Sequence, residues 1–407
     1  MVANANPCAI LLGGGVTALP VARSLARAGV PVIALGRSGD PVQRSRAVER
    51  FVDLGGGEPA QQRWRAWLEQ APSGSVVLPC EDDGLELVAR HRAELEALGL
   101  IPIEADDEVL LAMLDKEQTS ALAREHGIPA PRTLRISRQS DLAAAAQAIG
   151  FPSALKPLAS HRSKLFFREK AFVVSDLGEL CQAFDRVSAA GIEVLLTEIV
   201  PGPDAGHQSY YSYLDGDGQP LFHFTKRKPR QDPPGFGAGC FHETRWIPEV
   251  AELGLAFFQR VGVRGLANVE FKRDARDGEL KLIECNHRFT ASMALIHASG
   301  CDMALFTYNR LLGRPLPRAW PYRERHVLWC PREDVRAFRH YRRSGELSTA
   351  TWMRSLVRPM HFRVASWRDP APVVEAVARA AVSRARRVGR GSGDVEQAPK
   401  HPLGGAD

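Results

Sequence analysis

The chain has 407 residues and a mass of 44.7 kDa, with 44% hydrophobic and 25% charged residues. This length predicts two or three domains, and the apolar content excludes a wholly disordered protein. The net charge of +6 comes from the C-terminal region, because residues 331–390 hold 14 Arg, no Lys and five acids. The rest of the chain is close to neutral, so the pI of about 9.0 does not describe a uniformly basic surface.

The seven cysteines are scattered and contain no CxxC pair. This pattern disfavours a disulfide framework and a structural zinc site, and it predicts a cytoplasmic location. Residues 1–22 carry no charged side chain, but three glycines and Pro20 interrupt the apolar run, so we expect no signal peptide. We also expect no membrane span, because no segment reaches the roughly 18–20 apolar residues that one needs.

The N-terminal part of the chain has the pattern of an α/β unit. The predicted elements are, in order, a strand at 8–12, a glycine turn at 13–15, a helix at 17–28, strands at 30–35 and 75–78, and a helix at 85–98. A strand, helix and strand in succession predict a parallel sheet. Glu81, Asp82 and Asp83 follow the third strand, at the end where open α/β sheets bind ligands.

The middle of the chain has an α+β pattern with antiparallel strands. The predicted helices are 109–126, 141–149, 177–189 and 248–261, and the predicted strands are 153–156, 171–174, 194–199, 209–214, 221–225, 265–271 and 280–285. The segments 211–214 and 221–224 predict a hairpin across Asp215–Gly218. After Pro317 the pattern loosens, and only residues 373–388 predict a further helix, with an Arg-rich face.

These patterns predict four parts of the chain. They are an N-terminal domain at 1–107, a second unit at 108–320 with a smaller lobe at about 117–200, an Arg-rich region at 321–388, and a disordered tail at 389–407.

Two acids end neighbouring strands, and they are the strongest chemical signal in the sequence. Glu270 and Glu284 can face each other across an antiparallel hairpin, with Asn286 two residues further on. Two carboxylates and an amide oxygen are hard ligands that suit Mg²⁺. The alternative is a hairpin whose acids point into solvent.

Two further signals concern nucleotide binding. Lys156 ends an apolar strand, which suits a phosphate contact, although this signal taken alone favours an ordinary surface lysine. The strand at 194–199 runs into Pro201-Gly202, where backbone groups can read an adenine edge.

A basic run and a Gly-rich run follow the strand at 221–225. Lys226, Lys228 and Arg230 can neutralise a triphosphate or bind a substrate carboxylate, and residues 235–239 predict a mobile loop. The alternative is a solvated surface loop.

In this order, the acid pair, Lys156 and the hinge resemble the ATP-grasp superfamily over roughly residues 8–317. Within it they resemble the carboxylate–amine ligases of the carbamoyl-phosphate-synthase-like and D-aspartate-ligase-like group. The resemblance implies an α/β, Rossmann-like N-terminal domain followed by a two-lobed α+β ATP-grasp fold that holds ATP between its lobes.

The resemblance also implies roles for single residues. Lys116 and Lys156 would bind ATP, Glu198, Ile199 and Val200 would form the adenine hinge, and Asp204 or His207 would contact the ribose. Glu270, Glu284 and Asn286 would bind Mg²⁺ or Mn²⁺, and Arg288 would contact the phosphate or the acyl group. The lysines of the basic run, Lys226 and Lys228, are catalytic candidates on the strength of that run alone. A Gly-rich lid is missing after Lys156, where Ser160, His161, Ser163 and Lys164 are the candidates.

The implied reaction joins a small-molecule carboxylate to an amine through an acyl phosphate, with release of ADP and phosphate. We expect a homodimer by default and no nucleic-acid partner. Three alternatives stay open: an ATP-grasp carboxylase or carbamoyl-phosphate-type enzyme, an NADP-dependent oxidoreductase that uses Gly13–Ala18 and Arg37, and a nucleic-acid or membrane-surface binder that uses the Arg-rich end.

Overall fold

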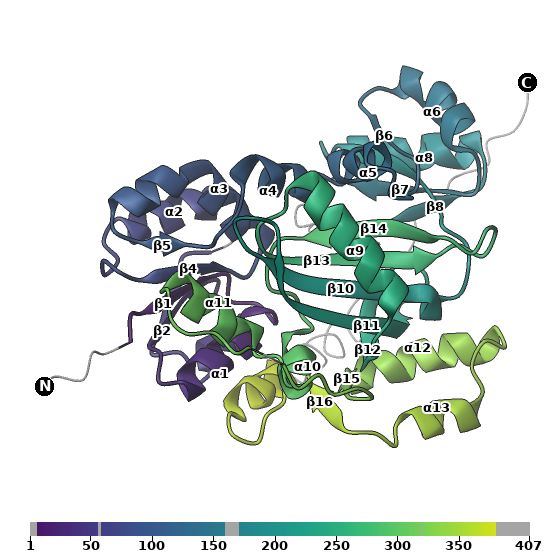
Figure 1. Cartoon of the computed structure of the whole chain (residues 1–407). Helices are drawn as coiled ribbons and strands as arrows, with labels where there is room; N and C mark the ends of the chain where they lie inside the picture. The colour runs from purple at the N-terminus through teal and green to yellow at the C-terminus, as the bar shows by residue number, and fades with distance from the viewer. Residues whose placement is uncertain (1–5, 56–57, 159–170, 319, 380–407) are drawn as a thin grey trace, which may run out of the picture.

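The computed structural model describes residues 6–55, 58–158, 171–318 and 320–379, which form three β-sheets with helices around them (Figure 1). No helix in these ranges is long and apolar enough to cross a membrane. The candidate lid residues Ser160, His161, Ser163 and Lys164, residues 380–388 of the predicted C-terminal helix, and the tail 389–407 lie outside the described residues.

The N-terminal sheet has five parallel strands in the order β3-β2-β1-β4-β5. The strands are β1 (Ala9–Leu12), β2 (Val32–Gly36), β3 (Arg50–Asp53), β4 (Val76–Pro79) and β5 (Ile101–Pro102), and the helices are α1 (Ala18–Arg27), α2 (Glu58–Leu68) and α3 (Asp82–Ala97), with the 3-10 turn η1 (Pro41–Arg44). Every residue of β1 and β4 is buried, as the apolar runs predict for a parallel sheet covered on both faces.

The second sheet has four antiparallel strands in the order β6-β9-β7-β8. Its strands are β6 (Thr133–Ile136), β7 (Ser153–Pro157), β8 (Phe172–Val174) and β9 (Val194–Glu198), with α6 (Leu142–Ile149), α8 (Leu177–Ser188) and the 3-10 turn η2 (Gln139–Asp141). A separate core of apolar side chains from this sheet, α6 and α8 stabilises it. We call these residues the small lobe, at the upper right of Figure 1.

The single helix predicted at 109–126 is wrong, because the chain forms α4 (Asp107–Leu114) and α5 (Lys116–Glu125). Asp115 separates them with extended backbone angles, and its Oδ1 accepts hydrogen bonds from the N–H groups of Glu117 (2.8 Å) and Gln118 (3.2 Å). An aspartate that caps the following helix ends the preceding one, although the apolar spacing continues through both.

The third sheet has seven strands in the order β14-β13-β10-β11-β12-β15-β16, antiparallel except between β15 and β16. The strands are β10 (His207–Leu214), β11 (Pro220–Asp232), β12 (Ala238–Thr244), β13 (Gly265–Arg273), β14 (Leu280–Asn286), β15 (Val327–Trp329) and β16 (Met360–Phe362). The predicted hairpin is confirmed, because Tyr211 pairs with Phe224 and Tyr213 with Phe222. Helix α9 (Pro248–Val261) covers one face, where Phe258 packs on Tyr210 (Figure 1).

Strand β11 is much longer than the predicted 221–225, and it includes the basic run. Lys226, Lys228 and Arg230 are buried. The alternative of a solvated surface loop is therefore wrong, because the run pairs with β10 on one side and with β12 on the other.

The C-terminal part is more ordered than the sequence pattern indicates. Helix α12 (Pro331–Arg343) packs on β11 and β12, helix α13 (Thr349–Ser355) packs on α12 through the stacked rings of Phe338 and Trp352, and β15 and β16 extend the third sheet. At the end of this part, Asp369 accepts hydrogen bonds from Ser45 Oγ (2.6 Å) and Arg23 Nε (2.8 Å) of the N-terminal part. The C-terminal part is thereby fixed to both larger sheets.

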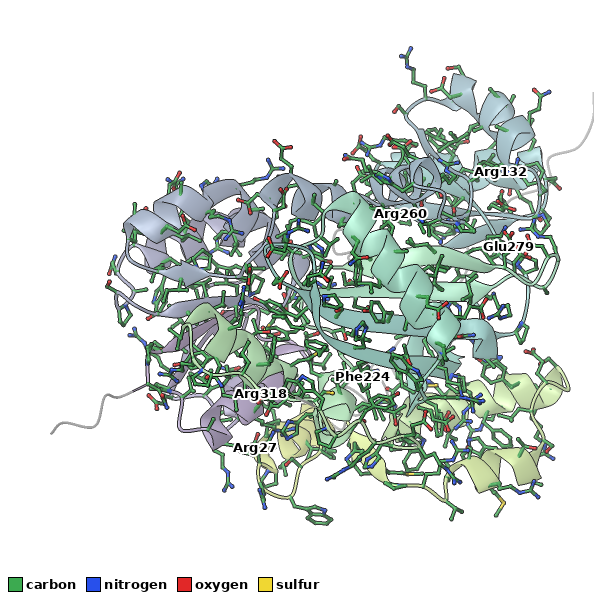
Figure 2. The ribbon with its side chains drawn as sticks, viewed as in Figure 1. Arg27, Arg132, Phe224, Arg260, Glu279 and Arg318 are labelled. Atoms are coloured by element: carbon green, nitrogen blue, oxygen red, sulfur yellow. The ribbon has the colours of Figure 1, made fainter. Side chains whose placement is uncertain are left out.

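One apolar core joins the N-terminal sheet to the third sheet. It contains β1, β2 and β4, but also Tyr211, Phe224 and residues of α10 (Met293–Ala298) and α11 (Met303–Leu311). Figure 2 shows Phe224 in the middle of the molecule. The two sheets therefore pack against each other through buried side chains, whereas the small lobe has its own core.

Candidate active site

The acid pair forms as the hairpin pattern predicts. In the register of β13 and β14, Glu270 lies opposite Glu284, and Asn268 lies opposite Asn286. Residues that face each other in an antiparallel pair point to the same side of the sheet. Ser209 of β10 pairs with both Glu270 and Lys226, so these side chains share that face. We call it the acid-pair face.

The two acids have different surroundings. Glu270 Oε1 lies 2.7 Å from Lys228 Nζ and 3.2 Å from His207 Nδ1. Burial alone would raise the pKa of Glu270, but Lys228 and His207 outweigh it and hold this pKa well below its ordinary range. Glu284 is exposed and forms no ion pair with any residue that the structure describes. A charged, half-buried carboxylate thus stands beside an exposed one.

Lysines from the four-stranded and the seven-stranded sheet gather around these acids. Burial and the neighbouring Lys116 lower the pKa of Lys156, on β7, to about 8, and Glu284 and Lys272 also act on it. Burial lowers the pKa of Lys226 to about 8 despite the Glu270 carboxylate. Crowded cations with lowered pKa values indicate a site that is completed by an anion.

The hinge residues follow β9. The Glu198 carboxylate accepts a hydrogen bond from the Arg132 N–H (3.2 Å) and lies 2.7 Å from Arg276 Nη2. Burial would raise the pKa of Glu198, but these contacts lower it. The carbonyl of Val200 accepts a hydrogen bond from Lys272 Nζ (2.8 Å). These contacts attach the segment 198–200 to the third sheet, beside the acid pair.

The two ribose candidates lie in different environments. His207 lies beside Glu270, and burial lowers its pKa. Asp204, in the 3-10 turn η3 (Asp204–Gly206), is buried and accepts hydrogen bonds from Tyr341 Oη (2.6 Å), Gln231 Nε2 (2.8 Å) and the Gly235 N–H (2.9 Å). The carboxylate of Asp204 therefore already accepts three hydrogen bonds from groups of the same chain.

Arg288 connects the end of β14 with the N-terminal sheet. Its Nε donates to Asp82 Oδ1 (2.5 Å), and its Nη1 donates to the Phe289 carbonyl (3.2 Å). Burial opposes the charge, but Asp82 and Glu284 outweigh it and raise the pKa of Arg288. The guanidinium thus lies between Glu284 and the carboxyl end of β4.

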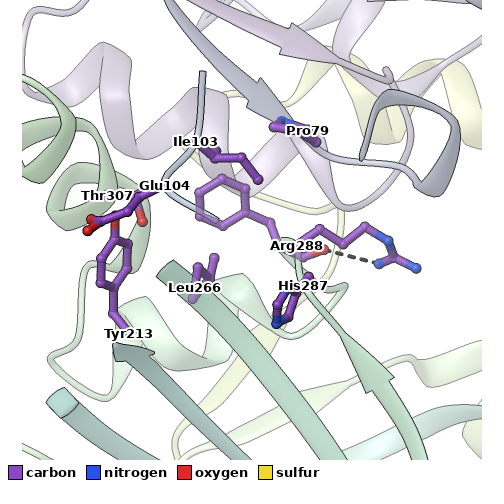
Figure 3. Close-up of a pocket in the computed structure, with 9 residues that line it drawn as sticks. Pro79, Ile103, Glu104, Tyr213, Leu266, His287, Arg288 and Thr307 are labelled. Atoms are coloured by element: carbon purple, nitrogen blue, oxygen red, sulfur yellow. Dashed lines mark hydrogen bonds between the residues drawn. The ribbon is translucent and has the colours of Figure 1, made fainter. Parts of the chain in front are cut away.

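A small cavity lies behind Arg288, between residues of the two sheets (Figure 3). Its volume is about 10 Å³, roughly that of one water molecule. Burial lowers the pKa of His287, which lines it, to about 4, so this ring is neutral. Neither ring nitrogen of His287 has a hydrogen-bond partner among the described residues. This cavity suits a buried water and is too small for a substrate.

The glycine turn after β1 is filled by carboxylates. Gly13 has a φ of +108°, and a Cβ there would lie 2.6 Å from Glu81 Cγ. Glu81 Oε1 accepts a hydrogen bond from the Gly15 N–H (3.2 Å), and burial with nearby Asp40 raises the pKa of Glu81. These acids would repel the phosphates of a dinucleotide, so the turn favours a structural or substrate-binding role.

The donor set of the acid pair fits a divalent cation. Two carboxylates and the amide of Asn286 are the oxygen ligands that Mg²⁺ or Mn²⁺ takes, with water and phosphate in the other positions. Among the described residues, no group of three or more His, Cys, Asp or Glu is placed to hold a metal ion. Substrate phosphates would therefore have to complete the coordination.

Sequence reasoning missed two buried side chains of this site. Lys272 stands two residues after Glu270 in β13, and this spacing places it on the same face, so it could have been found. His242 Nδ1 lies 3.2 Å from Lys226 Nζ, and burial with that lysine holds the pKa of His242 well below its ordinary range. No motif marks His242, because β12 itself was not predicted.

Comparison with solved structures shows that the chain has the ATP-grasp fold. One such structure is the biotin carboxylase domain of 2-oxoglutarate carboxylase from Hydrogenobacter thermophilus, in complex with MgADP, ADP and bicarbonate. The TM-score is 0.61 and the identity 18%, and the match covers 78% of this chain and 73% of that one.

The chain is similar in sequence to ligases. It is 26% identical over 251 residues to a D-aspartate ligase of Enterococcus faecium, covering 59% of each chain. It is 30% identical over 181 residues to a D-alanine–D-alanine ligase of Methylococcus capsulatus, covering 42% of this chain and 55% of the relative. The chain thus matches somewhat more than half the length of these curated relatives. No family model matches the chain.

Proposed function

We propose that this chain is an ATP-dependent carboxylate–amine ligase that forms an amide through an acyl phosphate and releases ADP and phosphate. The observation that carries the proposal is the Glu270–Glu284 pair, with lysines of two sheets around it. The similarity to D-aspartate and D-alanine–D-alanine ligases supports a carbon–nitrogen ligase. The strand order 3-2-1-4-5 of the N-terminal sheet supports a Rossmann-like domain within residues 1–107.

Each residue has a proposed task in phosphoryl transfer. Lys116 and Lys156 bind the nucleotide phosphates, and the segment 198–200 borders the adenine. Glu270, Glu284 and Asn286 would hold Mg²⁺, and the bound ion would supply positive charge against the phosphates. Arg288 stabilises the acyl phosphate and its tetrahedral successor, and Lys226 or Lys228 binds the substrate carboxylate. His207, beside Glu270 on the acid-pair face, remains the proposed ribose contact, whereas Asp204 is set aside because its carboxylate already accepts three hydrogen bonds of this chain.

Substitution of the open acid tests the metal site. Glu284→Gln should leave the fold intact, because Glu284 is exposed, and should lower ATP turnover by about 100-fold or more, since a metal ion supplies several kcal/mol. ADP release is measured with mixed amino acids as acids and amines, and far-ultraviolet circular dichroism checks the fold. Glu279→Gln on the same hairpin is the matched control. Turnover near normal in folded Glu284→Gln would refute the assignment.

A thermal-shift comparison tests which nucleotide the chain binds. Mg-ATP at about 100 times its dissociation constant should raise the free energy of unfolding by about 2.7 kcal/mol. NADPH is the parallel control, and we expect no stabilisation because the acids at the glycine turn repel its phosphates. Stabilisation by NADPH alone would instead support the oxidoreductase alternative. Bicarbonate-dependent ADP release without an amine would support the carboxylase alternative.

A further inference from the structure

A second cavity lies on the opposite face of the third sheet from the acid pair. Its volume is about 440 Å³, within the range of small-molecule sites. Side chains of β11, β12, η3, α12 and α13 line it. Arg227 follows Lys226 in β11 and pairs with Gln208 and Glu243, so it points away from the acid-pair face. We call this cavity the rear cavity.

Four arginines line the rear cavity, and they differ in how far their charge is neutralised. Arg230 lies 2.5 Å from Asp334 Oδ1 and also donates to Oδ2 (3.1 Å), so it is paired. Arg227 and Arg358 share the single carboxylate of Glu243. Arg354, in the last turn of α13, is exposed and forms no ion pair with any residue that the structure describes.

Each carboxylate that lines the cavity already accepts at least one hydrogen bond from this chain. Glu243 accepts from two arginines, and Asp204 accepts from Tyr341, Gln231 and Gly235. Glu346 accepts a hydrogen bond from Ser344 Oγ (2.7 Å). Each guanidinium has five N–H donors. The carboxylate of Glu243 therefore accepts only a few of the donors that Arg227, Arg354 and Arg358 carry together. The cavity therefore offers an excess of cationic donors.

We propose that the rear cavity binds a small organic anion through a carboxylate or phosphate group. Arg354 and Arg358 hold the anionic group, since guanidinium donors match both of these groups in a bidentate fashion. Pro229, Phe241 and Leu347 supply apolar walls for the remainder of the molecule. This site is separate from the nucleotide site, because the sheet lies between them.

Arginine footprinting of the full chain tests the site directly. Peptide mass spectrometry monitors the modification of each arginine by phenylglyoxal. Mg-ADP is present throughout to occupy the proposed nucleotide site. Citrate and inorganic pyrophosphate are the probes. At least one of them should slow modification of Arg354, while Arg343 at the end of α12, outside the cavity, should be unaffected. Protection by citrate alone indicates a carboxylate ligand, and protection by pyrophosphate alone a phosphate ligand; protection by both supports a site for either group.

Calorimetry with the protecting probe gives the second measurement. Arg354→Glu should weaken binding at least about tenfold, because one charge-assisted contact is lost and a repulsive charge is added. Arg343→Glu changes the net charge equally and should leave the affinity unchanged. The proposal is overturned if neither probe protects Arg354, if Arg343 is protected equally, or if both variants bind as the parent chain does.

Discussion

Lys226 shows how a single residue of the site can reduce stability. Its Nζ is buried between Ser209 Oγ (3.1 Å) and His242 Nδ1 (3.2 Å), neither of which carries a negative charge. The buried ammonium is therefore under-compensated in the absence of an anion, and its pKa falls to about 8. The buried ammonium of Lys226 therefore lowers the stability of the fold while it supplies positive charge to the candidate active site.

Lys226→Met should increase the free energy of unfolding at pH 7 by roughly 1–3 kcal/mol, because the unfolded lysine titrates near 10.4 and the folded one near 8. Between these two pH values the unfolded chain keeps the Lys226 proton and the folded chain has lost it. The loss of folding stability caused by the buried lysine is therefore at its full size below about pH 8. The advantage of the variant should therefore disappear as pH rises toward about 10.4. Urea unfolding at both ends of this range measures it. Lys281→Met, whose lysine pairs with Asp277 and has a raised pKa, should give no increase, and an equal gain there would contradict the explanation.

Part of this residue-scale picture could be predicted from the sequence. The opposition of Glu270 and Glu284 follows from two short strands and a turn, which are local features. The contact between Lys228 and Glu270 could not be predicted, because it joins residues 42 apart through the order of strands in the sheet. The same holds for Arg288 and Asp82, which lie 206 residues apart.

At the scale of elements, Asp115 decides where two helices separate. Its carboxylate caps α5 through two backbone N–H groups and also binds Arg135 Nη2 (2.6 Å) on β6. Apolar periodicity gives no sign of this break, because Leu110, Leu114 and Leu122 keep helical spacing across it. A capping residue is visible in the sequence, but an aspartate inside a periodic run is equally compatible with an uninterrupted helix.

Asp115→Ala should lower the free energy of unfolding by about 1–2 kcal/mol, since the cap and the Arg135 pair are both lost. Asp115→Asn should cost less, because its amide oxygen still accepts from the N–H groups of α5. Urea unfolding of both variants provides the comparison. Equal losses would show that the Arg135 pair, and not the cap, is the source of the stability.

At the scale of the whole molecule, side chains far apart in the sequence fasten the C-terminal part to the N-terminal sheet. Asp369 is buried and accepts from Ser45, Arg23 and the Arg46 N–H (3.2 Å). Burial would raise the pKa of Asp369, but these donors lower it. The loose sequence pattern after Pro317 could not reveal this contact, because its partners lie more than 300 residues earlier.

Asp369→Asn should lower the free energy of unfolding at neutral pH by about 3 kcal/mol, as expected for breaking a buried charged contact. The contribution of a carboxyl with a lowered pKa is complete above its unfolded pKa of about 3.9 and is lost as pH falls below it. The difference between parent and variant should therefore shrink in acid. Urea unfolding near pH 7 and near pH 3 measures this change.

Glu375→Gln is the control for this contact, because Glu375 forms partly exposed ion pairs with Arg44 and Arg379. This substitution should lower the free energy of unfolding by less than about 1 kcal/mol. Limited trypsin digestion should also cleave Asp369→Asn faster after Arg363 or Arg368 than it cleaves the parent. A difference that stays constant between neutral and acid pH would show that the carboxylate charge of Asp369 is not what holds this part.

The shared core has a consequence for how the chain is made. The N-terminal sheet buries apolar side chains against α10 and α11, and Tyr308 Oη donates a hydrogen bond to the Pro7 carbonyl (2.5 Å). On the ribosome, the first hundred residues emerge long before these partners exist. The N-terminal sheet therefore keeps part of its surface uncovered until synthesis has passed α11, which ends at Leu311.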